Sequence, residues 1–320
     1  MRIWHIVRTG LHQGVLSLLK LARFVLPAVF LLNLLGQSRL FGLLAGWFTP
    51  LTAPLGLPGV AALALLTGLL VNKFAGIAGL LLLPLSPAQA VVAGVFLALA
   101  HNVMVELLIV WQSRLPLVRF ALLRVGTAYL AATVLHLLLR WTGWFSQTPL
   151  PPILASPVAQ VGGHSVYWVA GLQALRSLWA LAQYLLPLFV LMEVLRQTNL
   201  LRRLERFTQP FTRMLRLQPS LAPVLLAGLL LGVATGAGVM EQALRDRSPE
   251  SEVPGELWRL NLFLQLFHSI IEDTVMFALF PVSIAVIAVV RLLVAWSASL
   301  LLPAPHAQRA GRPTASPPAA

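Results

Sequence analysis

The stretch Phe267-His268-Ser269-Ile270-Ile271-Glu272-Asp273-Thr274 lies inside an apolar run that extends from Leu257 to Pro281. The run is long enough to cross a bilayer, which takes about 20 helical residues. Charged side chains near the middle of such a segment are costly, at roughly 2.5–3.5 kcal/mol each on insertion scales. They normally face a protein interior or a wet cavity. The stretch therefore predicts a polar centre enclosed by membrane helices.

The composition places the whole chain in the membrane. Of its 320 residues, 58% are hydrophobic and only 10% are charged, whereas a soluble domain carries about 25% charged residues. The apolar runs are long and do not alternate with polar residues, so we expect helices rather than a β-barrel. The net charge of +13 comes from short basic clusters between apolar runs, which set membrane orientation and do not indicate a nucleic-acid partner. Because cysteine is absent, thiolate nucleophiles and cysteine metal sites are excluded.

The fold class that we expect is an all-α polytopic membrane protein. Continuous apolar runs predict membrane helices at about 11–35, 88–111, 117–139, 165–195, 257–281 and 282–302. Residues 40–58 contain three prolines and are not expected to form one regular helix.

Two further apolar segments are interrupted. Asn72 and Lys73 break the segment 59–83, and a glycine-rich run containing Thr235, Gly236 and Gly238 breaks the segment 222–244. Such interruptions predict broken or re-entrant helices whose backbone can approach a ligand. The alternatives are a plain helix from which Lys73 snorkels and close helix packing through small residues.

The chain contains an internal repeat. At an offset of 160 residues Leu26-Pro27 matches Leu186-Pro187 and Gly76 matches Gly236, and at an offset of 167 the pairs are His101 with His268 and Glu106 with Asp273. Duplicated halves are typical of transporter folds. We therefore divide the chain into a first repeat with its following helix, a non-cytoplasmic loop, a second repeat with its following helix, and a disordered tail, at 11–140, 141–164, 165–302 and 303–320.

The charge distribution predicts that the repeats are inverted. If each interrupted segment enters and leaves on one side, the basic clusters and both termini fall in the cytoplasm, in agreement with the positive-inside rule. These regions are 1–10, 114–124 (with Arg114, Arg119 and Arg124), 196–216, 245–259 and 303–320. If both segments instead cross fully, the termini and residues 245–259 fall outside. We expect the first arrangement.

These paired features resemble the Gate, or nucleoside-recognition, domain family. In each half a proline-containing helix precedes a glycine-broken segment and a polar membrane helix, and the stretch from His268 to Thr274 resembles the motif of a bacterial branch. The family is related to spore maturation proteins, concentrative nucleoside transporters and the membrane part of ferrous-iron transport GTPases. The resemblance covers roughly 20–110 and 180–280, and it implies a solute pathway in a bacterial inner membrane. No P-loop is present, so no GTPase domain is expected, and no cofactor is expected.

The interpretation that follows is a permease-like protein for a small polar solute or ion, such as a nucleoside-like solute or a cation. Its partners would be the lipid bilayer, that solute and other copies of the chain. The candidate binding residues are the polar and glycine positions of the two halves: Asn72, Lys73, His101, Asn102, Glu106, Thr235, Gly236, Gly238, His268, Glu272, Asp273 and Thr274.

Two other functions stay open at this point. A non-transporting membrane scaffold would use the polar residues to hold helices together. An intramembrane metalloenzyme would use His268 and Glu272, which share a helix face at a spacing of four, with His101 as a third ligand. No serine, cysteine or second nearby histidine completes a catalytic set, so we do not expect an enzyme.

Overall fold

The computed structural model describes residues 2–36, 38–112, 116–150, 165–197, 209–232, 254–279 and 284–302. Within these ranges the regular elements are all helical. Among the described residues, five helical spans are long and apolar enough to cross a membrane, at Ile3–Gly36, Pro87–Leu107, Leu117–Thr142, Val166–Leu195 and Ile284–Leu301. The expected all-α membrane protein is confirmed.

The helices of the two halves correspond in order. The first half contains α1 (Arg2–Gly36), α2 (Arg39–Thr52), the short 3₁₀ helix η1 (Ala53–Leu55), α3 (Ala61–Leu70), α4 (Lys73–Leu80), α5 (Pro87–Ala100), α6 (Val103–Gln112) and α7 (Leu117–Thr142). The second half contains α8 (Val166–Gln197), η3 (Pro219–Leu221), α10 (Ala222–Leu231), α12 (Pro254–Leu266), α13 (Ile270–Phe277) and α14 (Ile284–Leu301). At the offsets of the sequence repeat, α1 corresponds to α8, α3 to α10, α5 to α12, α6 to α13 and α7 to α14.

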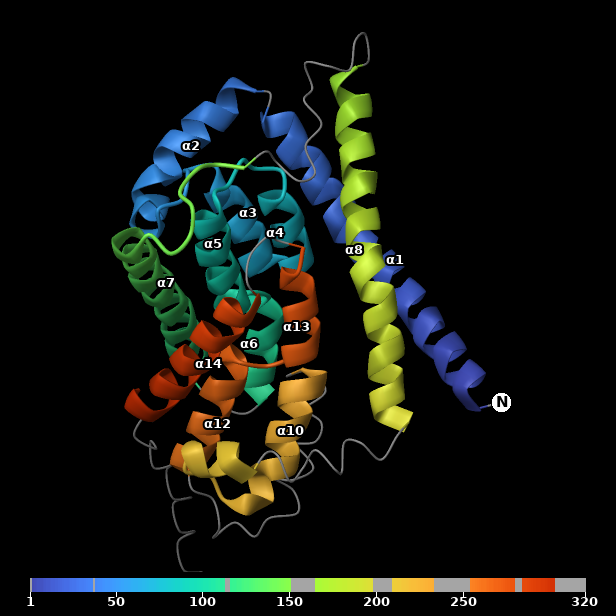
Figure 1. The fold of residues 1–320 in the computed structure, drawn as a ribbon, viewed down its shortest axis with the longest axis vertical. Coiled ribbons are helices and arrows are strands. Elements are labelled where there is room, and N and C mark those ends of the chain that lie inside the picture. Colours follow the sequence, from blue (N-terminus) through green and yellow to red (C-terminus); the bar gives the residue numbers. More distant parts are fainter. Residues whose placement is uncertain are drawn as a thin grey trace, which may run out of the picture.

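Corresponding helices run in opposite directions. In Figure 1, α1 rises from the N-terminus and crosses α8, which descends beside it. Glycines allow the two helices to touch, because a Cβ atom on Gly10 would lie 2.7 Å from the Cα of Val190 and one on Gly14 would lie 3.1 Å from Leu186. The contacts move toward the N-terminus of α8 as α1 advances, so the pair is antiparallel. The repeats are therefore inverted.

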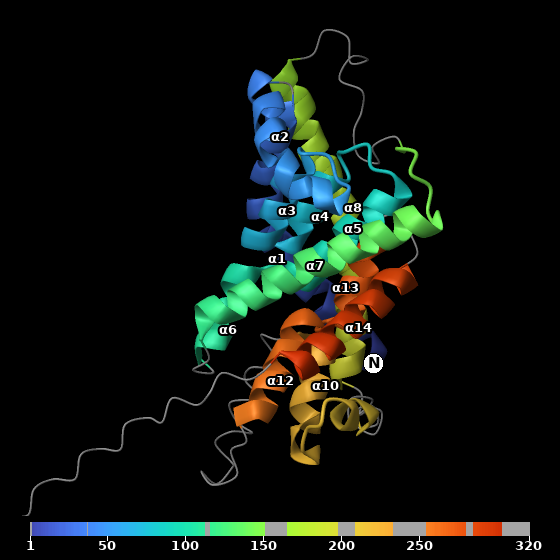
Figure 2. The ribbon, with the colours of Figure 1, turned by 90° about the vertical axis from the view of Figure 1, so that its left-hand side faces the viewer.

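The α1–α8 pair stands to one side of a bundle built around α5. Twelve residues of α5 are buried, so this helix forms the centre of the bundle. Figure 2 shows α7 crossing the face of the bundle opposite the α1–α8 pair. A T-shaped contact between Phe120 of α7 and Trp258 of α12, with ring centroids 4.9 Å apart, joins the two halves.

The interrupted segment 59–83 forms a helical hairpin, as the sequence predicts. Asn72 ends α3 with an extended backbone, and its side chain accepts a hydrogen bond from the amide of Ala75 at the start of α4. The two arms then pack closely, because a Cβ on Gly76 would lie 2.5 Å from the Cα of Gly68. Its counterpart in the second half runs into 233–240, outside the described residues.

The expectation of single continuous helices at 88–111 and 257–281 is wrong. The first is broken between α5 and α6, where Asn102 has a φ of 54°, and the second between α12 and α13, where Ser269 has a φ of 47°. The amide of Asn102 donates to the carbonyl of Gly68 (3.1 Å), and that of Ser269 donates to the carbonyl of Gly228 (3.2 Å). Each break is tolerated at membrane depth because a neighbouring helix accepts the released amide hydrogen.

Residues 40–58 do not form one regular helix, as expected, because α2 ends at Thr52 and the 3₁₀ helix η1 follows over Ala53–Leu55. Pro50 lies in the last turn of α2, where the missing amide removes a single backbone hydrogen bond and the helix ends shortly afterwards. The predicted tail at 303–320 and most of the predicted loop at 141–164 lie outside the described residues.

Candidate functional site

The two helix breaks bring the histidines of the two halves together. The rings of His101 and His268 have centroids 5.1 Å apart. In each ring Nδ1 lies close to the backbone carbonyl one turn earlier, at 2.8 Å for His101 with Leu97 and 2.9 Å for His268 with Leu264. A carbonyl oxygen can only accept a hydrogen bond, so Nδ1 carries the proton in both rings. When the rings are neutral, each Nε2 therefore presents a lone pair.

A buried arginine holds the carboxylate of the first half. Arg124 of α7 forms an ion pair with Glu106 of α6 and donates to the carbonyls of Leu99 (3.0 Å) and His101 (2.9 Å). It also donates to the side-chain oxygen of Gln265 at 2.9 Å. This guanidinium thus satisfies the carbonyls that the break in α5–α6 leaves without helical partners.

The second half repeats this arrangement. Arg291 of α14 pairs with Asp273 of α13, and its Nε donates to the carbonyl of Leu266 at 2.8 Å. All three residues stand 167 positions after Arg124, Glu106 and Leu99. The internal repeat therefore includes an arginine clamp at each helix break.

Sequence reasoning missed both arginines. It assigned Arg124 to a cytoplasmic basic cluster, but the residue is buried within α7. The charge of its partner Glu106 makes that burial tolerable, because a paired buried charge is far less costly than an isolated one. The signal was present in the sequence, since the offset that pairs His101 with His268 also pairs Arg124 with Arg291.

A third cation crosses between the halves and breaks the symmetry. Lys73, at the tip of the α3–α4 hairpin, places Nζ 2.6 Å from Asp273 and 2.7 Å from Glu272. The side chains of Lys73, Glu272 and Asp273 are 4%, 33% and 1% exposed. The positions that correspond to Lys73 and Glu272 are Val233 and Val105. The bridge from the first half to the second therefore has no symmetric counterpart from position 233 to Val105.

A cavity reaches this bridge from the side of the α1–α8 pair. It has a volume of about 380 Å³ and is lined by residues of α1, α8, the hairpin and the two broken helices. The polar residues of its wall are Ser17 and Lys20 of α1, Asn72, Asn102 and Glu272. The side-chain oxygen of Asn102 also accepts a hydrogen bond from the backbone amide of Lys73 at 3.0 Å. The cavity thus meets the bridge at Glu272, its partly exposed member.

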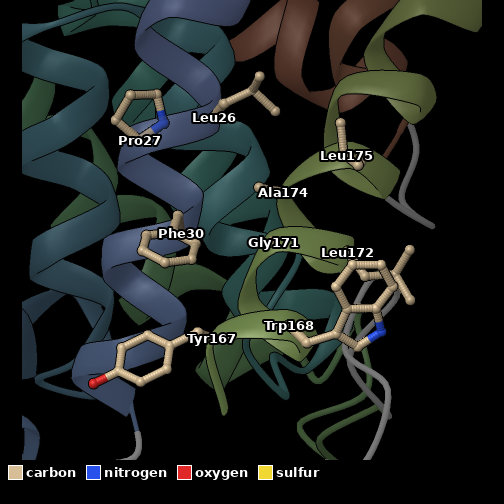
Figure 3. Close-up of a pocket in the computed structure, with 9 residues that line it drawn as sticks. All are labelled: Leu26, Pro27, Phe30, Tyr167, Trp168, Gly171, Leu172, Ala174 and Leu175. Carbon is tan, nitrogen blue, oxygen red and sulfur yellow. The ribbon is translucent and has the colours of Figure 1, made fainter. Parts of the chain in front are cut away.

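A second, apolar groove of about 530 Å³ lies between α1 and α8. Figure 3 shows Pro27 and Phe30 of α1 on one wall and Trp168, Leu172 and Leu175 of α8 on the other. Tyr167 and Trp168 are largely exposed. The groove offers no charged group and does not reach the polar centre, so it is not a candidate site for a polar solute.

Eight of the twelve predicted positions gather around the polar centre. They are Asn72, Lys73, His101, Asn102, Glu106, His268, Glu272 and Asp273. Thr274 lies in α13, but its side chain is outside the described part of the structure. Thr235, Gly236 and Gly238 also fall outside the described residues.

The sequence matches the Gate family, described as nucleoside recognition, over residues 18–114 and 178–297. It is also 28% identical, over 306 residues that span 96% of each chain, to the uncharacterized membrane protein YvoD of Bacillus subtilis (strain 168). No solved structure matches the chain. The first matched segment runs from within α1 to the end of α6, and the second runs from within α8 into α14, so each contains one of the two broken helices.

Proposed function

The chain belongs to the Gate, or nucleoside recognition, family, and from this we propose that it is a permease-like protein of a bacterial inner membrane. It would move a small polar solute or ion across the bilayer and bind it where the two repeats meet. The observation that carries the proposal is the Lys73 bridge beside the cavity of about 380 Å³. Inverted repeats with broken helices at mid-depth are the architecture in which secondary transporters bind their cargo.

The solute would enter the cavity and contact Asn72, Asn102 and Glu272. Amide groups donate and accept hydrogen bonds, and the Glu272 carboxylate accepts them, so a hydroxyl-bearing, nucleoside-like solute or a cation suits this wall. Thr274, Thr235, Gly236 and Gly238 complete the proposed pathway by their positions in the sequence. Both termini would lie in the cytoplasm, with 11–140 and 165–302 as the two transport units.

The Lys73 bridge provides a means of coupling binding to movement. It ties the hairpin tip of the first half to α13 of the second half. A solute or ion that interacts with Glu272 competes with Lys73 for this carboxylate. Binding would therefore weaken the contact between the halves. Alternating access requires that this contact changes as the halves move.

A scaffold is the second candidate, and a specific observation favours it. Each of the three carboxylates at the centre already has a cationic partner, because Glu106 contacts Arg124, Asp273 contacts Arg291 and Lys73, and Glu272 contacts Lys73. A role in joining helices is sufficient to explain such pairs. The two functions differ in whether removal of the Glu272 charge affects flux or stability.

The test is flux through the purified full chain in proteoliposomes. Radiolabelled uridine and adenosine probe solute transport, and a pH-sensitive dye in the lumen probes proton movement. We expect flux of at least one probe above protein-free liposomes, and we expect Glu272→Gln to abolish it. The control is Glu193→Gln in α8, because Glu193 is a carboxylate outside the polar centre whose partner is Gln197 of the same helix. Absence of flux for every probe, or equal flux through parent and Glu272→Gln, would reject the proposal.

A further inference from the structure

The centre of the polar cluster contains three acceptor atoms that face one another. Nε2 of His268 lies 3.5 Å from Oε1 of Glu106, and Nε2 of His101 lies 3.9 Å from the same oxygen. Both histidines carry their proton on Nδ1, which the carbonyls of Leu97 and Leu264 hold in place. Two lone pairs and a carboxylate oxygen therefore converge, and they repel one another unless a positive species lies between them.

Nε2 of His101 is buried and has no hydrogen-bond partner among the residues that the structure describes. Leaving a buried polar group unpaired costs roughly 1–3 kcal/mol. The ring is nevertheless fixed with this atom pointing at the gap, because Nδ1 is anchored to its own helix. A histidine side chain that binds a cation would have this orientation.

From this geometry we propose that His101, His268 and Glu106 form a binding site for a divalent first-row transition-metal ion on the boundary between the repeats. Two imidazoles and one carboxylate are ligands that zinc and ferrous iron accept. Donors bound to one tetrahedral ion at about 2.0–2.1 Å lie about 3.3 Å apart. The observed separations of 3.5 and 3.9 Å exceed this value by about 0.2 and 0.6 Å, so the carboxylate and His101 must move closer together around the ion.

The supporting contacts are those of a metal centre. Metal-bound histidines generally donate their other ring nitrogen to a carbonyl or carboxylate, which fixes tautomer and orientation. Both histidines here do so, and Glu106 is oriented through its second oxygen by Arg124. Asp273 lies close enough to act as a further ligand, since its oxygen and the nitrogens of the two histidines all lie within 4.8 Å of one another.

A proton alone fits this gap less well than a metal ion. A proton shared between Glu106 and one histidine at about 2.7–3.2 Å leaves the nitrogen of the other histidine without a partner, whereas a metal ion binds both nitrogens and the carboxylate oxygen. The neighbouring cations Lys73, Arg124 and Arg291 oppose an added divalent charge. They would keep affinity below that of a closed structural site and so permit release. The ion's role as cargo rests on the proposed function, whereas its binding does not.

The experiment measures metal binding to the full chain, purified in detergent without a polyhistidine tag and stripped with a chelator. Equilibrium dialysis against Zn²⁺ and Co²⁺, followed by elemental analysis, gives stoichiometry and affinity. We expect one ion per chain. His101→Gln and His268→Gln should each weaken binding by at least about 10-fold, since even the loss of an outer-shell partner of a metal ligand has an effect of this size.

Two controls separate this site from other histidines. His136→Gln removes a histidine of α7 that lies beside Gly56, and it should leave affinity unchanged. A variant that combines His5→Gln and His12→Gln removes the histidines of a pocket near the N-terminus, and it should also bind normally. Loss of the ion in either control, with retention in the His101 and His268 variants, would overturn the proposal.

X-ray absorption at the zinc edge of the parent protein provides a measurement that does not depend on variants. It should show two imidazole nitrogens at about 2.0–2.1 Å with oxygen ligands. A shell without two imidazoles, or a parent that binds no stoichiometric ion, rejects the site even if the variants fail to fold. Metal binding without flux of any probe, Zn²⁺ now included among the probes, would retain this site and reject the transport proposal, and flux without metal binding would do the reverse.

Discussion

The Lys73–Asp273 contact should be a strong energetic link between the two halves. Both side chains are almost completely buried, and Nζ lies 2.6 Å from the Asp273 oxygen. Removing one partner of a buried ion pair costs roughly 3–5 kcal/mol, because the remaining charge loses its compensation. Lys73→Met keeps the length of the side chain and removes its charge, and Asp273→Asn keeps the shape of the carboxylate.

The two substitutions should differ in size. Lys73→Met leaves Asp273 with Arg291, and it leaves Glu272 partly exposed to solvent. Its cost should therefore lie below that range, at about 2–3 kcal/mol. Asp273→Asn removes a partner from both Lys73 and Arg291, so we expect about 3–5 kcal/mol. In the double variant the unpaired lysine charge is absent, and the loss should fall short of the sum by about 1–3 kcal/mol.

The assay is equilibrium unfolding in mixed micelles by titration with sodium dodecyl sulfate. Tryptophan fluorescence reports the transition, since Trp258 is buried in the core. The control cycle combines Lys73→Met with Glu193→Gln, whose partner lies in its own helix, and should be additive within about 0.5 kcal/mol. A coupling between Lys73 and Asp273 no larger than this control would refute the bridge as a link between the halves.

Three further predictions concern the backbone and the topology. Gly76→Val should destabilise the protein by about 1–3 kcal/mol in the same titration, because a Cβ would lie 2.5 Å from the Cα of Gly68; unchanged stability would show that the hairpin is not tightly packed. Ser269→Gly should match or exceed the parent in stability, since its φ of 47° suits glycine, and a loss above about 1 kcal/mol would contradict a strained break. Single cysteines at His5 and Ser146, both exposed, should react with impermeant maleimide from opposite sides of the membrane, with His5→Cys on the cytoplasmic side. Labelling of both from the same side would reject the inverted topology.

The sequence was sufficient to predict which polar residues of the two halves correspond. His101 and His268, and likewise Glu106 and Asp273, stand at the same offset, and inverted halves place such positions at the same depth. The pattern works because polar residues inside a membrane are costly and are kept only where they have partners. The partners themselves were harder to predict.

Arg124 shows why the clamps were missed. A basic residue close to other arginines and to the start of an apolar run satisfies the positive-inside rule as a loop residue. Its real environment depends on α7 packing beside α6, which places the guanidinium against Glu106 and the carbonyl of Leu99. Hydropathy carries no information about such a contact, whereas the repeat does, through Arg291.

The helix breaks were missed for a related reason. The apolar runs around Asn102 and Ser269 are long enough for one helix each, and hydropathy reports the environment of a side chain rather than the direction of the backbone. The left-handed conformation at both residues is stabilised by carbonyls of Gly68 and Gly228. These acceptors belong to other helices, so a local reading of the sequence cannot identify them.

The contacts that both halves share at the centre and the contact that only one half has should differ in their effects on flux and on stability. A scaffold needs only buried pairs, and the two halves supply these equally as Glu106 with Arg124 and Asp273 with Arg291. Glu272 has no acidic counterpart in the first half, keeps a third of its side-chain surface exposed, and lines the cavity. Because a partly exposed carboxylate contributes little to stability and Lys73 keeps Asp273 as a buried partner, a purely structural role gives little reason for a second charge there. Removal of that charge should therefore reduce flux far more than stability, whereas Arg124→Met should primarily destabilise the fold. The scaffold would be favoured if Glu272→Gln left the flux per folded molecule unchanged and destabilised the protein as much as Arg124→Met does.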